Sequence, residues 1–198
     1  IILFIFFSSI NFNGQIELSN LFSDNMILQQ ESNVNFWGKA QKNQELLIYT
    51  SWSGNIFKTT VNNDGNWKIK IKTPSAGGPF NIQITCNSET KTINNVLIGE
   101  VWLASGQSNM QWKLNQCKDC IDNQDEEIAN ANYEEIRFFN NPMDLSMKVV
   151  KNQSWRKVKS EYAKEREGIN SKESFSATGY FFARELHKKL KVPIGTVS

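Results

Sequence analysis

The hydrophobic pattern of the chain changes its period near residue 98. From residue 16 to about residue 97, turn residues separate short apolar runs and segments in which apolar and polar residues alternate. This pattern is typical of strands with one solvent-exposed face. The predicted strands cover residues 26–29, 34–38, 45–49, 56–61, 67–71, 80–86 and 90–97. Several short strands at this spacing predict a small all-β sandwich.

A turn signal at residues 63–66 separates two of these strands. Because Gly65 tolerates a positive φ, the sequence predicts a hairpin that pairs 56–61 with 67–71. Trp67, Ile69 and Ile71 alternate with lysines, so this strand is expected to bury one face and expose the other.

After residue 98, the pattern predicts strands and helices in alternation. The apolar run 101–104 is expected to be a buried strand that ends at the edge of a sheet. Further extended pieces are predicted at 136–139, 155–158 and 194–197, and the charged segment 160–172 is predicted to be a loop. A strand, a helix and a second strand imply a right-handed crossover and an α/β sheet.

The clearest helix is predicted over residues 174–190. Ser174 or Ser176 can cap its start. Spacing predicts an apolar stripe made by Phe175, Phe182, Leu186 and Leu190. The surface positions are expected to be Glu185, His187, Lys188, Lys189 and Lys191, with positive charges near the helix C-terminus.

Composition narrows the class of protein only slightly. A net charge of +2 over 198 residues gives no reason to expect a nucleic-acid partner or an anionic membrane surface. Six tryptophans are compatible with core packing and with an exposed sugar-binding surface. The apolar opening run is too short to span a bilayer, so residues 1–14 are interpreted as the remnant of a signal peptide. The protein is therefore expected to be exported, either secreted or periplasmic.

Cysteine and carboxylate spacing give no metal site. Cys117 and Cys120 have CxxC spacing, but no second pair of ligands accompanies them, so a local disulfide or two free thiols are expected. The carboxylates between Asp119 and Glu127 lack the spacing of a calcium loop, and a solvated loop leading into a helix is the preferred interpretation. No cofactor is expected.

Ser108 is the candidate nucleophile. It follows the apolar run 101–104, and the neighbouring Gly106 allows a sharp turn that brings backbone N–H groups close to a reacting centre. The Ser108 N–H is a candidate oxyanion donor, and the Gln107 and Asn109 amides can bind substrate or hold the turn. The residues alone do not form the G-x-S-x-G elbow, and such clusters often make turns only.

Three stretches resemble the sialate O-acetylesterase family, a branch of the SGNH hydrolases. They are residues 100–110 (EVWLASGQSNM), residues 21–30 (LFSDNMILQQ), and residues 175–186 (FSATGYFFAREL) followed by 192–195 (VPIG). The resemblance runs from about residue 18 to the end. It implies a carbohydrate O-acetylesterase with Ser108 as nucleophile and no metal, and a three-layer, flavodoxin-like α/β domain after the sandwich.

The resemblance also has departures. The oxyanion glycine of the family is expected just past Ser198, and the later oxyanion Asn and the Asp-x-x-His pair have no counterpart in this sequence. The single histidine, His187, matches neither, and Gln107 stands where related esterases often carry Asp. The sequence is therefore interpreted as an N-terminal fragment with a truncated α/β domain, and the fragment itself is expected to be inactive.

These interpretations divide the chain into 1–14 (signal-peptide remnant), 15–98 (β-sandwich) and 99–198 (incomplete SGNH-type domain). The expected partner is an O-acetylated sugar or glycan: sialic acid acetylated at O9 or, within the same class, acetylated xylan. The alternative is a noncatalytic secreted carbohydrate-binding or cell-surface module. The sequence does not give the oligomeric state.

Overall fold

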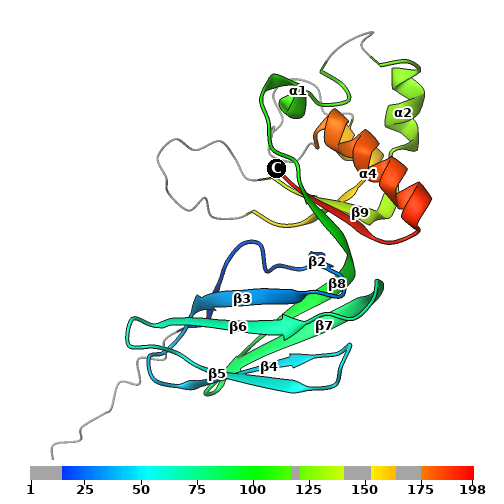
Figure 1. Cartoon of the computed structure of the whole chain (residues 1–198). Helices are drawn as coiled ribbons and strands as arrows, with labels where there is room; N and C mark the ends of the chain where they lie inside the picture. The colour runs from blue at the N-terminus through cyan, green and yellow to red at the C-terminus, as the bar shows by residue number, and fades with distance from the viewer. Residues whose placement is uncertain (1–14, 117–120, 141–152, 164–174) are drawn as a thin grey trace, which may run out of the picture.

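A computed structural model describes residues 15–116, 121–140, 153–163 and 175–198 of the chain. Figure 1 shows a β-rich half and a half with both helices and strands, joined by one long strand, β8 (Glu89–Leu103). The predicted signal-peptide remnant at 1–14 and the pair Cys117 and Cys120 lie outside the described residues. No helix in the described part of the chain is long and apolar enough to cross a membrane.

The β-rich half consists of two sheets around a shared core. Its strands are β1 (Glu17–Leu18), β2 (Ile27–Gln29), β3 (Asn33–Lys39), β4 (Glu45–Thr50), β5 (Ile56–Thr60), β6 (Asn66–Lys72), β7 (Gly77–Cys86) and the first part of β8. One sheet has the order β1-β3-β6. In the other, β5, β4, β7 and β8 are neighbours in that order, and β2 pairs in parallel with β8. The β-rich first half that the alternation predicts is confirmed.

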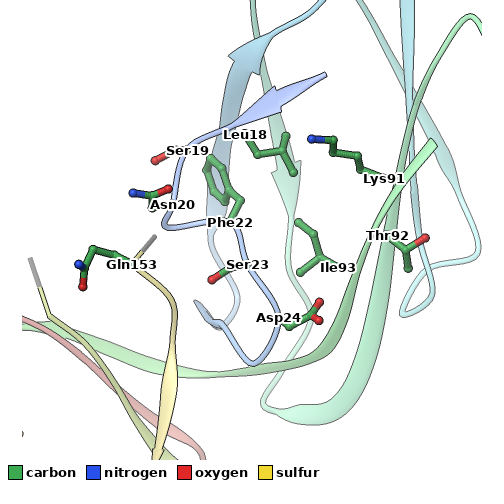
Figure 2. Close-up of a pocket in the computed structure, with 10 residues that line it drawn as sticks. All are labelled: Leu18, Ser19, Asn20, Phe22, Ser23, Asp24, Lys91, Thr92, Ile93 and Gln153. Atoms are coloured by element: carbon green, nitrogen blue, oxygen red, sulfur yellow. The ribbon is translucent and has the colours of Figure 1, made fainter. Parts of the chain in front are cut away.

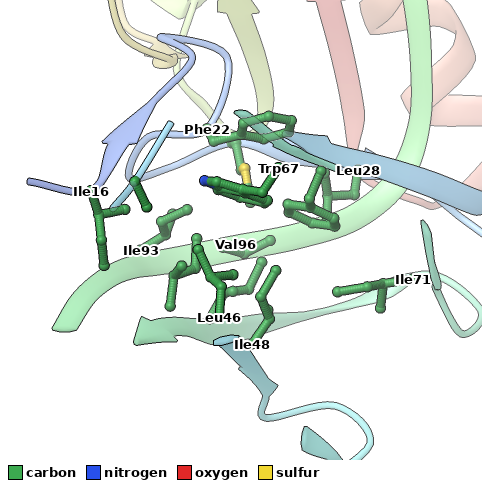
Figure 3. Close-up of a cluster of buried hydrophobic side chains, with 14 of the residues drawn as sticks. Ile16, Phe22, Leu28, Leu46, Ile48, Trp67, Ile71, Ile93 and Val96 are labelled. Atoms are coloured by element: carbon green, nitrogen blue, oxygen red, sulfur yellow. The ribbon is translucent and has the colours of Figure 1, made fainter. Parts of the chain in front are cut away.

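Apolar side chains from both sheets fill this core (Figure 3). Phe36 on β3 and Leu46 on β4 are completely buried, although their strands belong to different sheets. Trp67 and Ile71 point into the same core, whereas the lysines between them on β6 are exposed. The predicted buried and wet faces of this strand are therefore confirmed.

The turn before β6 forms as predicted, but the hairpin does not. The Asn62 side chain accepts hydrogen bonds from the N–H groups of Asp64 and Asn66, and Gly65 has a φ of +80°. The flanking strands then separate, because β5 pairs with β4 and β6 pairs with β3. The predicted pairing is wrong because a turn signal fixes the local reversal of the chain, whereas sheet membership depends on the partners available to each strand.

β8 continues without interruption from the β-rich half into the second half. Its first part pairs with β7, and residues 100–103 pair in parallel with β11 (Ile194–Val197). The expected domain boundary between residues 98 and 99 falls inside this strand. A Cβ atom on Gly99 would lie 2.0 Å from the carbonyl oxygen of Pro193, so only glycine permits this close approach.

Parallel strands form the centre of the second half. Its remaining elements are α1 (Ser108–Gln111), α2 (Gln124–Asn130), β9 (Tyr133–Phe139), β10 (Arg156–Val158), α3 (Ser160–Ala163) and α4 (Ala177–Leu190). β11 lies between β8 and β9, parallel to both, and β10 pairs antiparallel with β9. The predicted strands after residue 130 are present. The loop predicted over 160–172 is wrong at 160–163, where α3 forms, and the three-layer SGNH arrangement remains a prediction.

α4 buries a different face from the predicted stripe. Ser176 is its N-cap, and its buried residues are Ala177, Gly179, Tyr180 and Ala183. Phe182 and Leu190 are 44% and 50% exposed, so their assignment to the core is wrong. Three small residues and Tyr180 form the buried face of the helix, and Phe182 and Leu190 lie at the margin of the contact.

Arg137 on β9 joins the two halves. The residue is 2% exposed, and one guanidinium nitrogen donates to the carbonyl oxygens of Asn25 (2.8 Å) and Asn95 (2.6 Å). A second nitrogen donates to the Asn95 side chain, and Nε donates to the Glu134 carbonyl. Desolvation lowers the pKa of Arg137 to about 10, with the nearby carboxylates of Glu134 and Glu135 opposing this shift. This role of Arg137 was not predictable from the sequence, because a single arginine in a strand has no distinctive pattern.

Cys86 is expected to resist alkylation in the native protein. It is 4% exposed and carries a free thiol, and burial, as the largest cause, raises its pKa. Because the thiolate is the reactive form, we expect native Cys86 to react with iodoacetamide at least about 100-fold more slowly than in urea. Peptide-resolved mass spectrometry separates Cys86 from the other two cysteines. Equal rates in both conditions would contradict its burial.

Candidate active site

Ser108 lies at the edge where the parallel strands end. β8 ends at Leu103, and the Ala104 N–H still donates to the carbonyl oxygen of Val197 at 2.7 Å. The Ser198 N–H donates to the carbonyl oxygen of Phe139 at 3.0 Å, so β9 and β11 end beside each other. Ligands of α/β sheets bind at this carboxyl edge. The predicted placement of Ser108 just past a strand end is confirmed.

The loop 104–107 turns directly into α1. Ser108 is the first residue of this helix and is exposed, as are Gly106, Gln107 and Asn109. The Met110 N–H donates to the Gln107 carbonyl oxygen at 2.8 Å. A Cβ atom on Gly106 would lie 2.9 Å from Cγ of Met110, so a larger residue would displace the Met110 side chain. All four predicted site residues are therefore on one exposed turn, held by its own backbone.

The start of α4 holds this turn from the other side. The Thr178 hydroxyl donates to the Asn109 carbonyl oxygen at 3.0 Å, and the Ala177 N–H donates to the Trp112 carbonyl oxygen at 2.8 Å. The Ser176 hydroxyl caps α4 by accepting from the Gly179 N–H, and it lies 3.9 Å from the sulfur of Met110. Only the capping role of Ser176 is predictable from local sequence, because the contacts of Ser176 and Thr178 with residues 109–112 span more than 60 positions.

Removing the Thr178 hydroxyl is expected to loosen the Ser108 turn. In Thr178→Val the Asn109 carbonyl loses its partner, at a cost of about 1 kcal/mol, so the Met110 and Trp112 amides should exchange hydrogen roughly fivefold faster. Hydrogen exchange measured by NMR tests this, with Thr178→Ser as the control that retains the hydroxyl. Unchanged exchange in the valine variant would show that the contact does not order the turn.

A second group of contacts fixes β8 before it reaches the turn. The Gln29 amide donates to Glu100 at 3.1 Å, and its oxygen accepts from the Val101 N–H at 2.9 Å. The Gln30 amide donates to the other Glu100 oxygen at 2.7 Å, and its oxygen accepts from the Ala76 N–H at 3.0 Å. The Gln29 side chain therefore binds the backbone of β8 just past the last residue that pairs with β2. The stretch 100–110 thus contacts both 21–30 and 175–186 in the fold.

Past Gly99, which pairs with Gln29, one edge of β8 has no neighbouring strand among the described residues. Residues 100–103 pair with β11 on one side only. Trp102 is 43% exposed, with its ring 5.2 Å from that of Phe182, and Leu103 is 75% exposed. The prediction that 101–104 is a buried strand is therefore wrong in its burial, although the strand itself forms. Because side chains of a strand point to the two faces of the sheet, an apolar run is buried only where other elements cover both faces.

His187 is far from the Ser108 turn. Its Nδ1 lies 2.8 Å from the Val192 carbonyl oxygen, and its Nε2 lies 3.9 Å from Glu135 at the start of β9. Along α4 it is nine residues beyond Thr178, about 14 Å of helix axis. His187 packs against Tyr133 and is only partly exposed, so its predicted position on an open charged surface is wrong. The prediction that His187 is not a partner of Ser108 agrees with this position.

Two titratable groups near the base of the turn have shifted pKa values. Burial lowers the pKa of Lys113, which follows the turn. Burial also raises the pKa of Tyr180, on the buried face of α4, to about 12, so its phenol stays protonated at neutral pH. Among the described residues, no group of three or more His, Cys, Asp or Glu residues is placed to hold a metal ion.

A separate surface pocket of about 330 Å³ lies on the β-rich half (Figure 2). It lies between residues 18–24 and the start of β8, with Phe22, Asp24 and Lys91 among its lining residues. Asp24 accepts a hydrogen bond from the Asn94 N–H, which fixes the wall of the pocket. None of the lining residues belongs to the Ser108 turn, so this pocket is not part of the candidate active site.

Comparison with known proteins finds relatives over most of the chain. The sialate O-acetylesterase of Mus musculus is 31% identical over 187 residues, which cover 87% of this chain and 33% of the mouse protein. The Homo sapiens sialate O-acetylesterase is 32% identical over 142 residues, covering 67% of this chain and 26% of the human protein. No family model matches the chain.

A solved structure shows the same fold. The crystal structure of a carbohydrate acetylesterase from Xanthomonas citri superposes with a TM-score of 0.78 at 30% identity, and the match covers 92% of this chain and 40% of that chain. In fold, the chain belongs with carbohydrate acetylesterases. Within that class it is a sialate O-acetylesterase-like family member. The chain spans about a third of the length of the mouse relative.

Proposed function

We propose that Ser108 is the nucleophile of a carbohydrate O-acetylesterase. The observation that supports this most strongly is the position of Ser108 on an exposed turn at the carboxyl edge of the parallel strands. The stretch 100–110, which contains this turn, contacts both of the other family-like stretches. Relatives named as sialate O-acetylesterases support the reaction class.

The proposed reaction is acyl transfer in two steps. The Ser108 oxygen attacks the acetyl carbonyl while a general base takes its proton, and the tetrahedral oxyanion is stabilised by N–H donors that include that of Ser108. Collapse breaks the ester bond, and the sugar hydroxyl leaves with the proton. Water then attacks the acetyl-serine, which releases acetate and restores the Ser108 hydroxyl.

The general base of this proposal is not His187. The imidazole is held near Val192 and Glu135, at the opposite end of α4 from Thr178. We therefore propose that the acid–base partners of Ser108 belong to a protein longer than these 198 residues, and that the 198-residue polypeptide alone does not hydrolyse esters. A nucleophile without its base loses several orders of magnitude in rate.

The proposed substrate is an acetyl ester on a sugar, and the proposed location of the protein is extracellular or periplasmic. Sialic acid acetylated at O9 is the first candidate, because the mouse and human relatives are sialate O-acetylesterases. Acetylated xylan is the second. Acetate release by a longer form of the protein from both substrates distinguishes them. No acetate from either substrate, together with activity on an unrelated ester, would refute the proposal.

A further inference from the structure

The outward face of β3 and β6 concentrates positive charge. Side chains on a strand alternate between faces, and here the inward positions of β6 carry Trp67, Ile69 and Ile71. The outward positions of β3 and β6 are Asn33, Asn35, Trp37, Lys39, Asn66, Lys68, Lys70 and Lys72. We call this set the basic face. Figure 1 shows its two strands side by side on the sandwich.

The strand register arranges the basic face in rows. Trp37 lies opposite Lys68, Asn35 opposite Lys70, and Asn33 opposite Lys72. Neighbouring lysines on β6 are two residues apart, which corresponds to about 7 Å along a strand. The face therefore presents three evenly spaced ammonium groups along one strand, with an indole and the Asn33 amide along the other, where Asn35 is only partly exposed.

The charge of the basic face is uncompensated. Among the described residues, none of Lys39, Lys68, Lys70 and Lys72 forms an ion pair, whereas Lys58 nearby is paired with Glu45. Glu17 on β1, opposite Lys39, is the only carboxylate in the three strands of this sheet. Four lysines and one glutamate give this sheet a net charge of +3, compared with +2 for the whole chain.

Trp37 gives the basic face an apolar element. Trp37 is 40% exposed. The rings of Trp37 and Phe22 pack edge to face, with their centroids 4.6 Å apart. The indole is therefore held in place while part of it remains accessible. An aromatic ring of this kind can stack against the C–H face of a sugar ring, and the neighbouring lysines can pair with carboxylates.

We propose that the basic face binds an anionic glycan chain, with its carboxylates on Lys68, Lys70 and Lys72 and a sugar ring on Trp37. A nucleic acid is the less favoured ligand, because the face has a single exposed aromatic ring and the chain carries a net charge of only +2. The binding involves no residue of the Ser108 turn, so it does not depend on the proposed esterase function.

Titration of the 198-residue protein with alginate, a polyuronate, tests this binding by isothermal calorimetry. At about 20 mM salt we expect saturable binding that weakens at least tenfold at about 300 mM, because exposed charges are screened. The variant K68E/K70E/K72E should bind at least tenfold more weakly. The matched control K188E/K189E/K191E changes the net charge equally at the C-terminal end of α4 and should bind within twofold of wild type. Trp37→Ala should weaken binding several-fold, and Ser108→Ala should not.

Several results would overturn the proposal. Equal losses in the two triple variants would show attraction to net charge alone. Binding of single-stranded DNA as tight as that of alginate would favour a nucleic-acid site, and binding of uncharged dextran as tight as that of alginate would remove the role of the lysines. Absence of alginate binding at low salt refutes it directly. Circular dichroism melts confirm that each variant is folded.

Discussion

Replacing Ser108 by alanine in a catalytically complete form of the protein is expected to reduce kcat for acetyl-ester hydrolysis on the order of 10³- to 10⁶-fold. The substitution removes only the hydroxyl oxygen. The exposed turn 106–110 is held by backbone hydrogen bonds and by Thr178, so its shape should persist. KM should change little, because the loss falls on the chemical step.

Ser105→Ala is the matched control for this experiment. Ser105 is exposed on the same loop, three residues before Ser108, and its replacement removes the same atom. We expect it to retain activity within a few-fold of wild type. p-Nitrophenyl acetate and an O-acetylated sugar serve as the two substrates. An unchanged rate for Ser108→Ala on both substrates would remove Ser108 from the mechanism.

Replacing Arg137 by methionine is expected to cost about 3–5 kcal/mol of stability. The guanidinium donates to the Asn25 and Asn95 carbonyl oxygens and to the Asn95 side chain, all at the junction of the two halves. Methionine fills similar space but leaves these half-buried acceptors without donors. Asn25 and Asn95 also have positive φ angles, 66° and 55°, so their turns lose the group that holds them.

Thermal unfolding measures this effect, and we expect the melting temperature to fall by roughly 10 °C. Lys189→Met is the control, because Lys189 is exposed on α4. This substitution should shift the unfolding midpoint by less than about 2 °C. Arg137→Lys keeps the charge but supplies one nitrogen in place of a planar fork, so it should recover only part of the loss. An unfolding midpoint within about 2 °C of wild type for Arg137→Met would contradict the proposed role of Arg137 in joining the two halves.

Local alternation predicted the positions of most strands, and sequence resemblance predicted the family. Trp67 and Ile71 face the core because period-two alternation is a property of the strand itself. The pairing between strands was not predictable in the same way. The turn at 62–66 forms, but β5 and β6 enter different sheets because each strand pairs with a segment distant in sequence.

The helical half shows the same limit. The Ser176 cap is a local signal and was predicted, whereas the buried face of α4 depends on the sheet beneath it. Tyr180 and Ala183 face that sheet, and Phe182 is left at the open edge of β8 beside Trp102. At the candidate site, the Ser108 turn was predicted from its sequence. The roles of Thr178 and Gln29 were not, because they reach the turn and β8 from distant stretches.

Covalent labelling at Ser108 tests the central claim most directly. A fluorophosphonate reacts with an activated serine hydroxyl, and peptide mapping by mass spectrometry locates the adduct. In a form of the protein as long as its relatives, we expect about one adduct per molecule, on Ser108, and none in Ser108→Ala. In the 198-residue polypeptide we expect labelling no higher than background, because His187 is held away from the turn. An adduct on another serine of the longer form, or none at all, would contradict the assignment of Ser108 as the nucleophile.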